Sequence, residues 1–331
     1  MSTIDSMTPE VEPTRAVQPP PSGRAAAPRP RRRRARTPLT WVRQGGLSRL
    51  LFLLPLLVIF AAFSWYPIIR LVVMSFQQTN EVVTTWVGFQ NFKEVWNDPL
   101  FPIAVRNTLE FAGLALLFGY PIPLIAAVLM SEVKKRRGLY AALAYLPVVI
   151  PPVVAVLLWK TFYDAGSTGV FNTILGWFGI PPQQWIQSTT QAMPSLVLES
   201  TWANAGGTII IYLAALTAVN PELYEAASVD GAGLWKKIWH VTLPQMRTVL
   251  LVTMILQIIG TAQVFLEPYL FTSGGPDNAT MTVLLLIYDY AFGNSLGAAY
   301  GEAAALSLML VAFLTVFSLI YLRATRAWSD E

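Results

Sequence analysis

Long apolar runs set the strongest limit on what this chain can fold into. Runs of roughly 20 residues, such as residues 50–69, match the length that a helix needs to cross a hydrocarbon core about 30 Å thick. Of the 331 residues, 54% are hydrophobic and only 13% are charged, whereas about a quarter are charged in an ordinary soluble domain. The sequence therefore predicts an all-α, polytopic membrane protein.

The predicted membrane spans number six. Prolines interrupt the first three of them, and a proline frees a backbone carbonyl that must be satisfied by a neighbouring helix or by water in a cavity. Kinked helices around a transport pathway and plain packing kinks are both consistent with these prolines. The spans cover about residues 50–69, 107–130, 139–161, 194–218, 247–271 and 300–322.

Basic residues predict how these spans are oriented. Of the 23 Lys and Arg residues, ten lie before or at Arg49, four in 132–138, three in 219–247 and two at the C-terminus, whereas 164–193 and 272–299 contain none. By the positive-inside rule both termini are cytoplasmic, which requires an even number of spans.

The same pattern divides the chain into three parts. Residues 1–44 are rich in Pro, Arg and Ala and lack apolar periodicity, so we expect a disordered cytoplasmic tail. Residues 45–325 form the predicted six-span domain, and residues 326–331 form a short cytoplasmic C-terminus.

Composition also excludes several kinds of site. The chain has no Cys and a single His, His240, which excludes Cys-ligated zinc, multi-His metal sites and thiol catalysis. It has no Gly-x-x-x-x-Gly-Lys-Ser/Thr loop for nucleotide phosphates. We therefore predict no catalytic residues, no metal and no cofactor in this chain, and we expect no nucleic-acid partner because its basic residues are localised along the chain.

The segment 220–244 has the local features of two short helices joined by a turn. Asn220, followed by a proline, suits the start of a helix. Gly231 can adopt backbone conformations that other residues avoid, so the first helix is expected to stop there. A second amphipathic stretch follows over 234–242, and Pro244 is expected to close or redirect it.

The spacing within this segment resembles a known family. Glu225-Ala226-Ala227, then Gly231, then Val241-Thr242-Leu243-Pro244 is similar to the Glu-Ala-Ala signature of binding-protein-dependent ABC-transporter permeases, with Val241 in place of the commoner Ile. A second resemblance narrows the branch. The segment 265–280, with Gly274-Gly275-Pro276, and the segment 88–108, with Asn91, Asp98-Pro99 and Asn107-Thr108, are similar to the first of two permeases in carbohydrate-uptake systems. Together the resemblance covers about residues 47–325.

This resemblance implies a mechanism and a set of partners. A cytoplasmic coupling helix would sit in a groove of a separate ATPase dimer that binds ATP and Mg. A second six-span permease, an extracytoplasmic solute-binding protein, a sugar or oligosaccharide and the lipid of a bacterial inner membrane would complete the system. The implied ATPase-coupling residues are Glu225, Ala226, Ala227, Gly231, Val241, Leu243 and Pro244.

Polar and aromatic residues within the fourth and fifth predicted spans are candidates for the solute path, because polar side chains facing lipid are costly. Hydrogen bonding between helices is the alternative role for such residues. The candidates are Trp202, Asn204, Thr208, Tyr212, Gly260, Gln263 and Glu267.

Two alternatives to sugar import remain. The same type of permease could carry a polyol or a glycerol-phosphate compound. An ion-coupled secondary transporter would also have kinked spans, but it would need a coupling-ion site and often an internal repeat, and it would leave the segment 220–244 without a role.

Overall fold

The computed structural model describes residues 46–80, 83–133, 135–293 and 298–329. The predicted tail, residues 1–44, lies outside this range. The chain divides into two units, residues 1–60 and 61–331. In the first unit the structure describes one helix, α2 (Gly46–Phe60), whose side chains from Leu51 onward are exposed.

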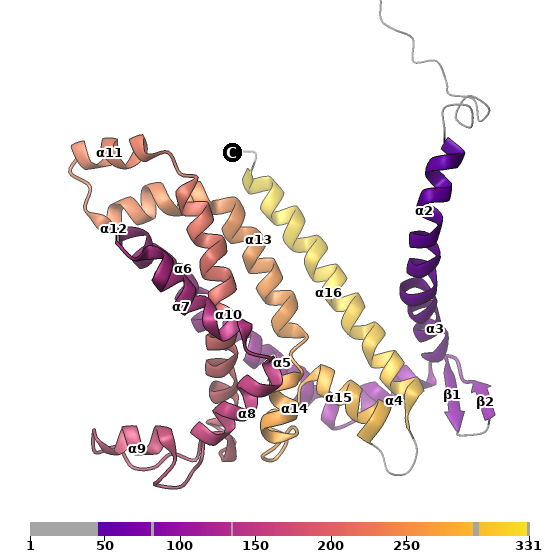
Figure 1. Ribbon diagram of the computed structural model, residues 1–331. Helices are drawn as coiled ribbons and strands as arrows, with labels where there is room; N and C mark the ends of the chain where they lie inside the picture. The colour runs from indigo at the N-terminus through magenta and orange to yellow at the C-terminus, as the bar shows by residue number, and fades with distance from the viewer. Residues whose placement is uncertain (1–45, 81–82, 134, 294–297, 330–331) are drawn as a thin grey trace, which may run out of the picture. The chain divides into compact units, whose positions relative to one another are not determined.

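The second unit confirms the all-α prediction, with one two-stranded hairpin as the exception (Figure 1). The hairpin pairs β1 (Gln77–Asn80) with β2 (Val83–Trp86) in antiparallel register. The helices up to residue 217 are α3 (Tyr66–Met74), α4 (Gln90–Asn97), α5 (Leu100–Leu114), α6 (Pro121–Glu132), α7 (Arg137–Val149), α8 (Pro152–Phe162), α9 (Val170–Gly176) and α10 (Ala192–Thr217). The later helices are α11 (Pro221–Val229), α12 (Leu234–Lys237), α13 (Leu243–Ala262), α14 (Leu266–Thr272), α15 (Val283–Tyr288) and α16 (Tyr300–Ser329).

Between four and six spans fit these helices. Four helical stretches are long and apolar enough to cross a membrane: Leu51–Met74, Leu100–Glu132, Leu234–Ala262 and Tyr300–Thr325. Two bent pairs, Arg137–Val149 with Pro152–Phe162 and Ala192–Thr217 with Pro221–Val229, would raise the number to six if each is one span. The predicted six therefore stays a prediction.

Prolines in this unit do two different things. Three of them, Pro67, Pro121 and Pro244, lie in the first turn of a helix that follows a five-residue π-helical turn. These turns are η1 (Ala61–Trp65) before α3, η2 (Ala115–Gly119) before α6 and η4 (Ile238–Thr242) before α13. The wider turn accommodates the missing N–H, and the helix continues. Pro244 therefore does not end its helix, but α12 and α13 run in different directions in Figure 1, which agrees with the expectation that Pro244 redirects the helix.

At Pro151-Pro152, two successive residues lack an N–H, and α7 and α8 meet at 94°. The predicted span 139–161 is thus broken rather than kinked. The predicted span 247–271 also divides, because α13 ends at Ala262 and α14 begins at Leu266. Pro268 has no N–H to donate to the carbonyl of Val264, which instead accepts the Thr282 hydroxyl at 3.0 Å.

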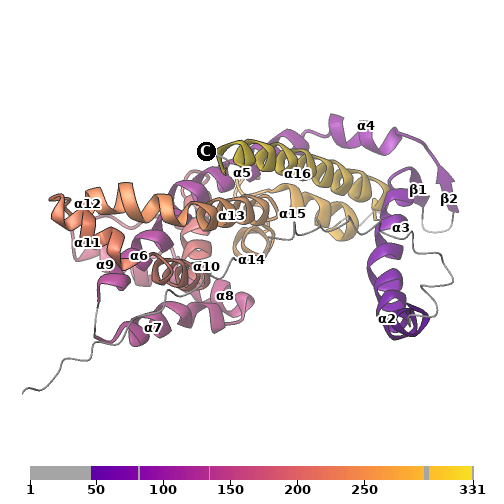
Figure 2. The ribbon, with the colours of Figure 1, turned by 90° about the horizontal axis from the view of Figure 1, so that it is seen from above.

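The helices α6 and α7 pack along α10 in the second unit (Figure 2). Gly206 makes the α7 contact possible, because a Cβ there would lie 2.2 Å from the carbonyl oxygen of Ala144. The α11–α12 element and α9 lie at opposite ends of α10 (Figure 1).

Buried amides and hydroxyls connect segments that are separated in the sequence. Asn107 donates to the carbonyls of Asn278 at 2.7 Å and Met281 at 3.0 Å, and Thr108 accepts from the backbone N–H of Val283 at 2.9 Å. Asn91, fully buried, donates to the carbonyl of Ser75 at 2.8 Å. Several residues that carry the family resemblance are therefore structural links between segments.

Asp98 also belongs to the segment that resembles the carbohydrate-uptake permeases, and both of its carboxylate oxygens accept hydrogen bonds. One carboxylate oxygen accepts the backbone N–H of Leu100 at 2.7 Å, and the other accepts the hydroxyl of Tyr290. Burial, with the hydrogen bond and the charge of Asp98, raises the pKa of Tyr290. The tyrosine therefore remains the donor at physiological pH.

Candidate functional site

The segment 220–244, here called the elbow, begins as its sequence predicts. The side chain of Asn220 accepts the backbone N–H of Glu222 at 3.1 Å and caps α11. This bond satisfies one of the donors that every helix leaves unpaired at its N-terminus.

Gly231 ends α11 in a left-handed conformation with φ of +72°. The N–H of Gly231 bonds to the carbonyl of Ser228 at 3.1 Å, and that of Ala232 bonds to Ala227 at 2.9 Å. These are the two bonds of a Schellman motif, in which glycine is favoured because it has no Cβ. The prediction of a turn at Gly231 is confirmed.

The remaining predicted coupling residues divide between an exposed tip on α11 and a partly buried base at the start of α13. Glu225 and Ala226 are exposed on α11, and Ala227 is half-buried. Val241 lies half-buried in η4. A charged and small-residue surface is thus presented outward, while the base of the elbow packs against the helices.

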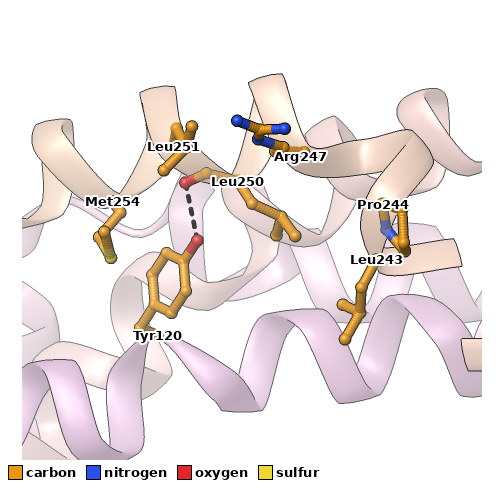
Figure 3. Close-up of a pocket in the computed structure, with 7 residues that line it drawn as sticks. All are labelled: Tyr120, Leu243, Pro244, Arg247, Leu250, Leu251 and Met254. Carbon is orange, nitrogen blue, oxygen red and sulfur yellow. Dashed lines mark hydrogen bonds between the residues drawn. The ribbon is translucent and has the colours of Figure 1, made fainter. Parts of the chain in front are cut away.

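Leu243 and Pro244 line a largely apolar groove of about 570 Å³ at the foot of α13 (Figure 3). Tyr120 lies across this groove, and its hydroxyl donates to the carbonyl of Leu250 at 2.7 Å. The hydrogen bond ties the junction of η2 and α6 to α13, the helix that continues directly from the elbow.

A second, more polar cavity of about 720 Å³ lies among α5, η2, α10 and α13. It brings together five of the seven predicted solute-path residues: Asn204, Thr208, Gly260, Gln263 and Glu267. Hydroxyl and amide groups that the sequence prediction missed also line it: Ser200, Thr201, Thr253, Gln257 and Thr261. Ser200 precedes Asn204 and Thr208 at intervals of four residues, so helical spacing was a signal for it.

The two other predicted residues lie outside this lining. Tyr212 is fully buried, and its hydroxyl pairs with that of Thr253 at 2.9 Å. Trp202 packs against Trp159, with ring centroids 5.4 Å apart. In this conformation both residues connect helices, the alternative role that the sequence left open.

The polar cavity has an acidic but no basic side chain in its described lining. Glu267 is the one ionisable residue among the described residues that line it. Glu199 lies nearby on α10 but is 1% exposed, and its Oε2 has no hydrogen-bond partner. The cavity therefore offers many neutral hydrogen-bonding groups, one carboxyl group and no basic side chain, a composition that suits the hydroxyls of a neutral solute.

Known proteins resemble this chain over most of its length. It is 33% identical over 284 residues to the arabinooligosaccharides transport system permease protein AraP of Bacillus subtilis, covering 85% of this chain and 89% of the relative. It is 33% identical over 281 residues to the lactose transport system permease protein LacF of Rhizobium radiobacter, covering 83% and 93%.

A solved structure has the same fold. A chain of a bacterial ABC transporter involved in the import of the acidic polysaccharide alginate superimposes with a TM-score of 0.76 at 30% identity, covering 86% of this chain and 97% of that one. A related structure holds the transporter in complex with an alginate pentasaccharide-bound periplasmic protein. Residues 119–329, which include the elbow and the α10 and α13 walls of the polar cavity, match the family of binding-protein-dependent transport system inner membrane components, and the chain belongs to that family.

Proposed function

We propose that this chain is the permease subunit of an ATP-driven importer for a neutral sugar or oligosaccharide. The observation that carries the proposal is the elbow: an exposed Glu225-Ala226 tip on a helix that is capped at Asn220 and closed by a Schellman turn at Gly231. Family membership and the sugar-transport relatives support the same role.

In this mechanism ATP is hydrolysed by a separate ATPase dimer, which also binds Mg. The tip of the elbow docks in a groove of the ATPase, where Glu225 meets a basic residue and the small Ala226 permits close approach. Movement of the elbow passes into α13, because η4 joins the two without a break. The α13 helix in turn forms one wall of the polar cavity.

The remaining parts of the system follow from the same role. The chain lies in a bacterial inner membrane with both termini cytoplasmic, beside a second six-span permease. An extracytoplasmic protein delivers the solute, as the complex of the alginate transporter with its periplasmic protein suggests. Coupling to a separate ATPase gives the elbow a role that an ion-coupled secondary transporter would not.

The polar cavity separates the candidate solutes. Its described lining lacks Lys, Arg and His, whereas a phosphate group is usually held by basic side chains. A neutral sugar or polyol therefore fits better than a glycerol-phosphate compound, and the relatives that carry oligosaccharides favour the sugar.

Reconstitution tests the proposal. The chain, its partner permease and the ATPase are placed in nanodiscs, and ATP hydrolysis is measured with solute-free and solute-loaded binding protein. The proposal predicts that the loaded form stimulates hydrolysis. An assembled complex that hydrolyses ATP at the same rate with solute-free and solute-loaded binding protein would contradict the proposal.

A further inference from the structure

The two arms of the elbow are joined by a closed ring of hydrogen bonds. The phenol oxygen of Tyr224 lies 3.0 Å from Oγ1 of Thr242, and Thr242 Oγ1 donates to the carbonyl of Lys237 at 3.4 Å. On the other side, Nζ of Lys237 donates to Oγ of Ser228 at 2.8 Å. Ser228 Oγ then donates to the carbonyl of Tyr224 at 2.7 Å, which returns the ring to its starting residue.

The donors and acceptors in this ring are consistent with one another. Thr242 uses its only hydroxyl proton on Lys237, so Tyr224 is the donor in the bond to Thr242. Ser228 likewise accepts from Lys237 and donates to Tyr224. The hydroxyls of Thr242 and Ser228 therefore each donate once and accept once, whereas the Tyr224 hydroxyl only donates. A hydroxyl that both donates and accepts is polarised by each of its neighbours.

The ring crosses the flexible point of the elbow. Tyr224 and Ser228 lie on α11, whereas Lys237 and Thr242 follow the turn at Gly231. Thr242 is only 3% exposed and Tyr224 is half-buried, so water competes weakly for the bond between them, whereas the bond between Lys237 and Ser228 is exposed. The ring therefore adds side-chain hydrogen bonds to the backbone bonds of the turn that set the angle between the two arms.

The π-helical turn places the threonine. Thr242 is the last residue of η4, and its hydroxyl reaches the carbonyl five residues earlier in the chain. The same turn accommodates Pro244 at the start of α13, so one local feature both lets the helix continue and directs Thr242 towards α11.

We propose that Tyr224, Ser228, Lys237 and Thr242 are positioning residues that make the elbow a rigid lever. This inference rests on the proposed function, because it assigns to the ring the transfer of ATPase movement into α13. The ring keeps α11 from swinging about Gly231 when the ATPase pulls on it. A loosened ring would let the ATPase turn over with less movement of the spans.

The test measures solute imported per ATP hydrolysed in proteoliposomes that contain the whole importer. Tyr224→Phe and Thr242→Val each remove one hydroxyl with little change in shape, and we expect each to lower this ratio about threefold to tenfold, the factor carried by one ordinary hydrogen bond. Thr242→Val removes the bond to Tyr224 and also the bond to Lys237, so the double variant should be no worse than Thr242→Val alone. Thr242→Ser should keep the wild-type ratio, since it restores the hydroxyl.

A lysine pair supplies the matched control. Lys237→Met should lower the ratio, whereas Lys236→Met, one residue earlier and exposed, should leave it unchanged. Hydrogen exchange over 221–232 should be faster in the ring variants than in the Lys236 variant. Unchanged import per ATP in Tyr224→Phe and Thr242→Val would overturn the ring, while a wild-type complex that fails to hydrolyse ATP on stimulation would instead overturn the proposed function.

Discussion

The elbow and the polar cavity differ in how they are built. The elbow is made from a single segment of 25 residues whose cap, turn and ring are local. The cavity takes its walls from helices that are far apart in the sequence, with Ala115 on one side and Gln257 on another. A local element can be specified by residue spacing, whereas a cavity between helices depends on how those helices pack.

The largest expected effect comes from reversing the charge on the elbow tip. Glu225→Lys should weaken binding of the ATPase by about 2 to 5 kcal/mol, because it replaces an attractive interfacial pair by a repulsive one. Copurification of the ATPase with the permease measures this effect. Glu222→Lys, a reversal on the same helix, should cost far less, and equal losses for both would show that the tip has no special role.

A basic side chain placed in the polar cavity should change which solutes bind there. Glu267→Arg should raise the affinity for an acidic oligosaccharide about 10-fold to 100-fold, since a hydrogen bond to a charged partner contributes about 1.5 to 3 kcal/mol. Saturation-transfer NMR on the permease pair in nanodiscs, with maltotriose and trigalacturonate as probes, measures the relative binding. Wild-type protein that binds both probes equally would contradict the assignment of this cavity to a neutral solute.

Two glycines of the elbow offer a sharper comparison. Gly231→Ala should destabilise the elbow by about 1 to 2 kcal/mol, because only glycine adopts its left-handed conformation without cost. Gly233, with φ of −70° and open space around its Cβ position, should accept alanine without loss. Hydrogen exchange of the α11 amides distinguishes the two variants, and similar exchange in both would show that the turn is not strained.

The smallest effect belongs to a hydrogen bond between helices. Tyr212→Phe removes the bond to Thr253 and should lower the free energy of unfolding by about 0.6 kcal/mol, the usual contribution of such a bond in a membrane protein. Thermal unfolding in detergent measures it. A large loss of sugar affinity without a change in stability would instead assign Tyr212 to the solute path.

The same division explains what the sequence predicted and what it missed. Asn220 and Gly231 act on neighbours within a few residues, so their roles in starting and ending α11 follow from local rules. Pro244 was expected to close or redirect its helix, and the helix changes direction there without ending, because the π-helical turn η4 accommodates the missing N–H. Local rules name the candidate for a break but do not choose between a break and a wider turn.

In the cavity, residue type indicated polar candidates but not their direction. Asn204 and Tyr212 lie on the same helix, yet one lines the cavity and the other is buried against Thr253. The break before Pro268 likewise depends on Thr282, which lies far along the chain and takes over the carbonyl of Val264. Contacts of this kind are set by tertiary packing.

Site-specific cross-linking examines the role of the elbow most directly. Because the chain has no Cys, Ala226→Cys places a single reactive thiol on the elbow tip, and Trp177→Cys places one on an exposed residue that follows α9. In the assembled importer, the thiol at position 226 should cross-link to the ATPase and the thiol at position 177 should not. An assembled complex in which position 226 captures no ATPase, at any stage of nucleotide binding, would contradict the elbow as the site of coupling.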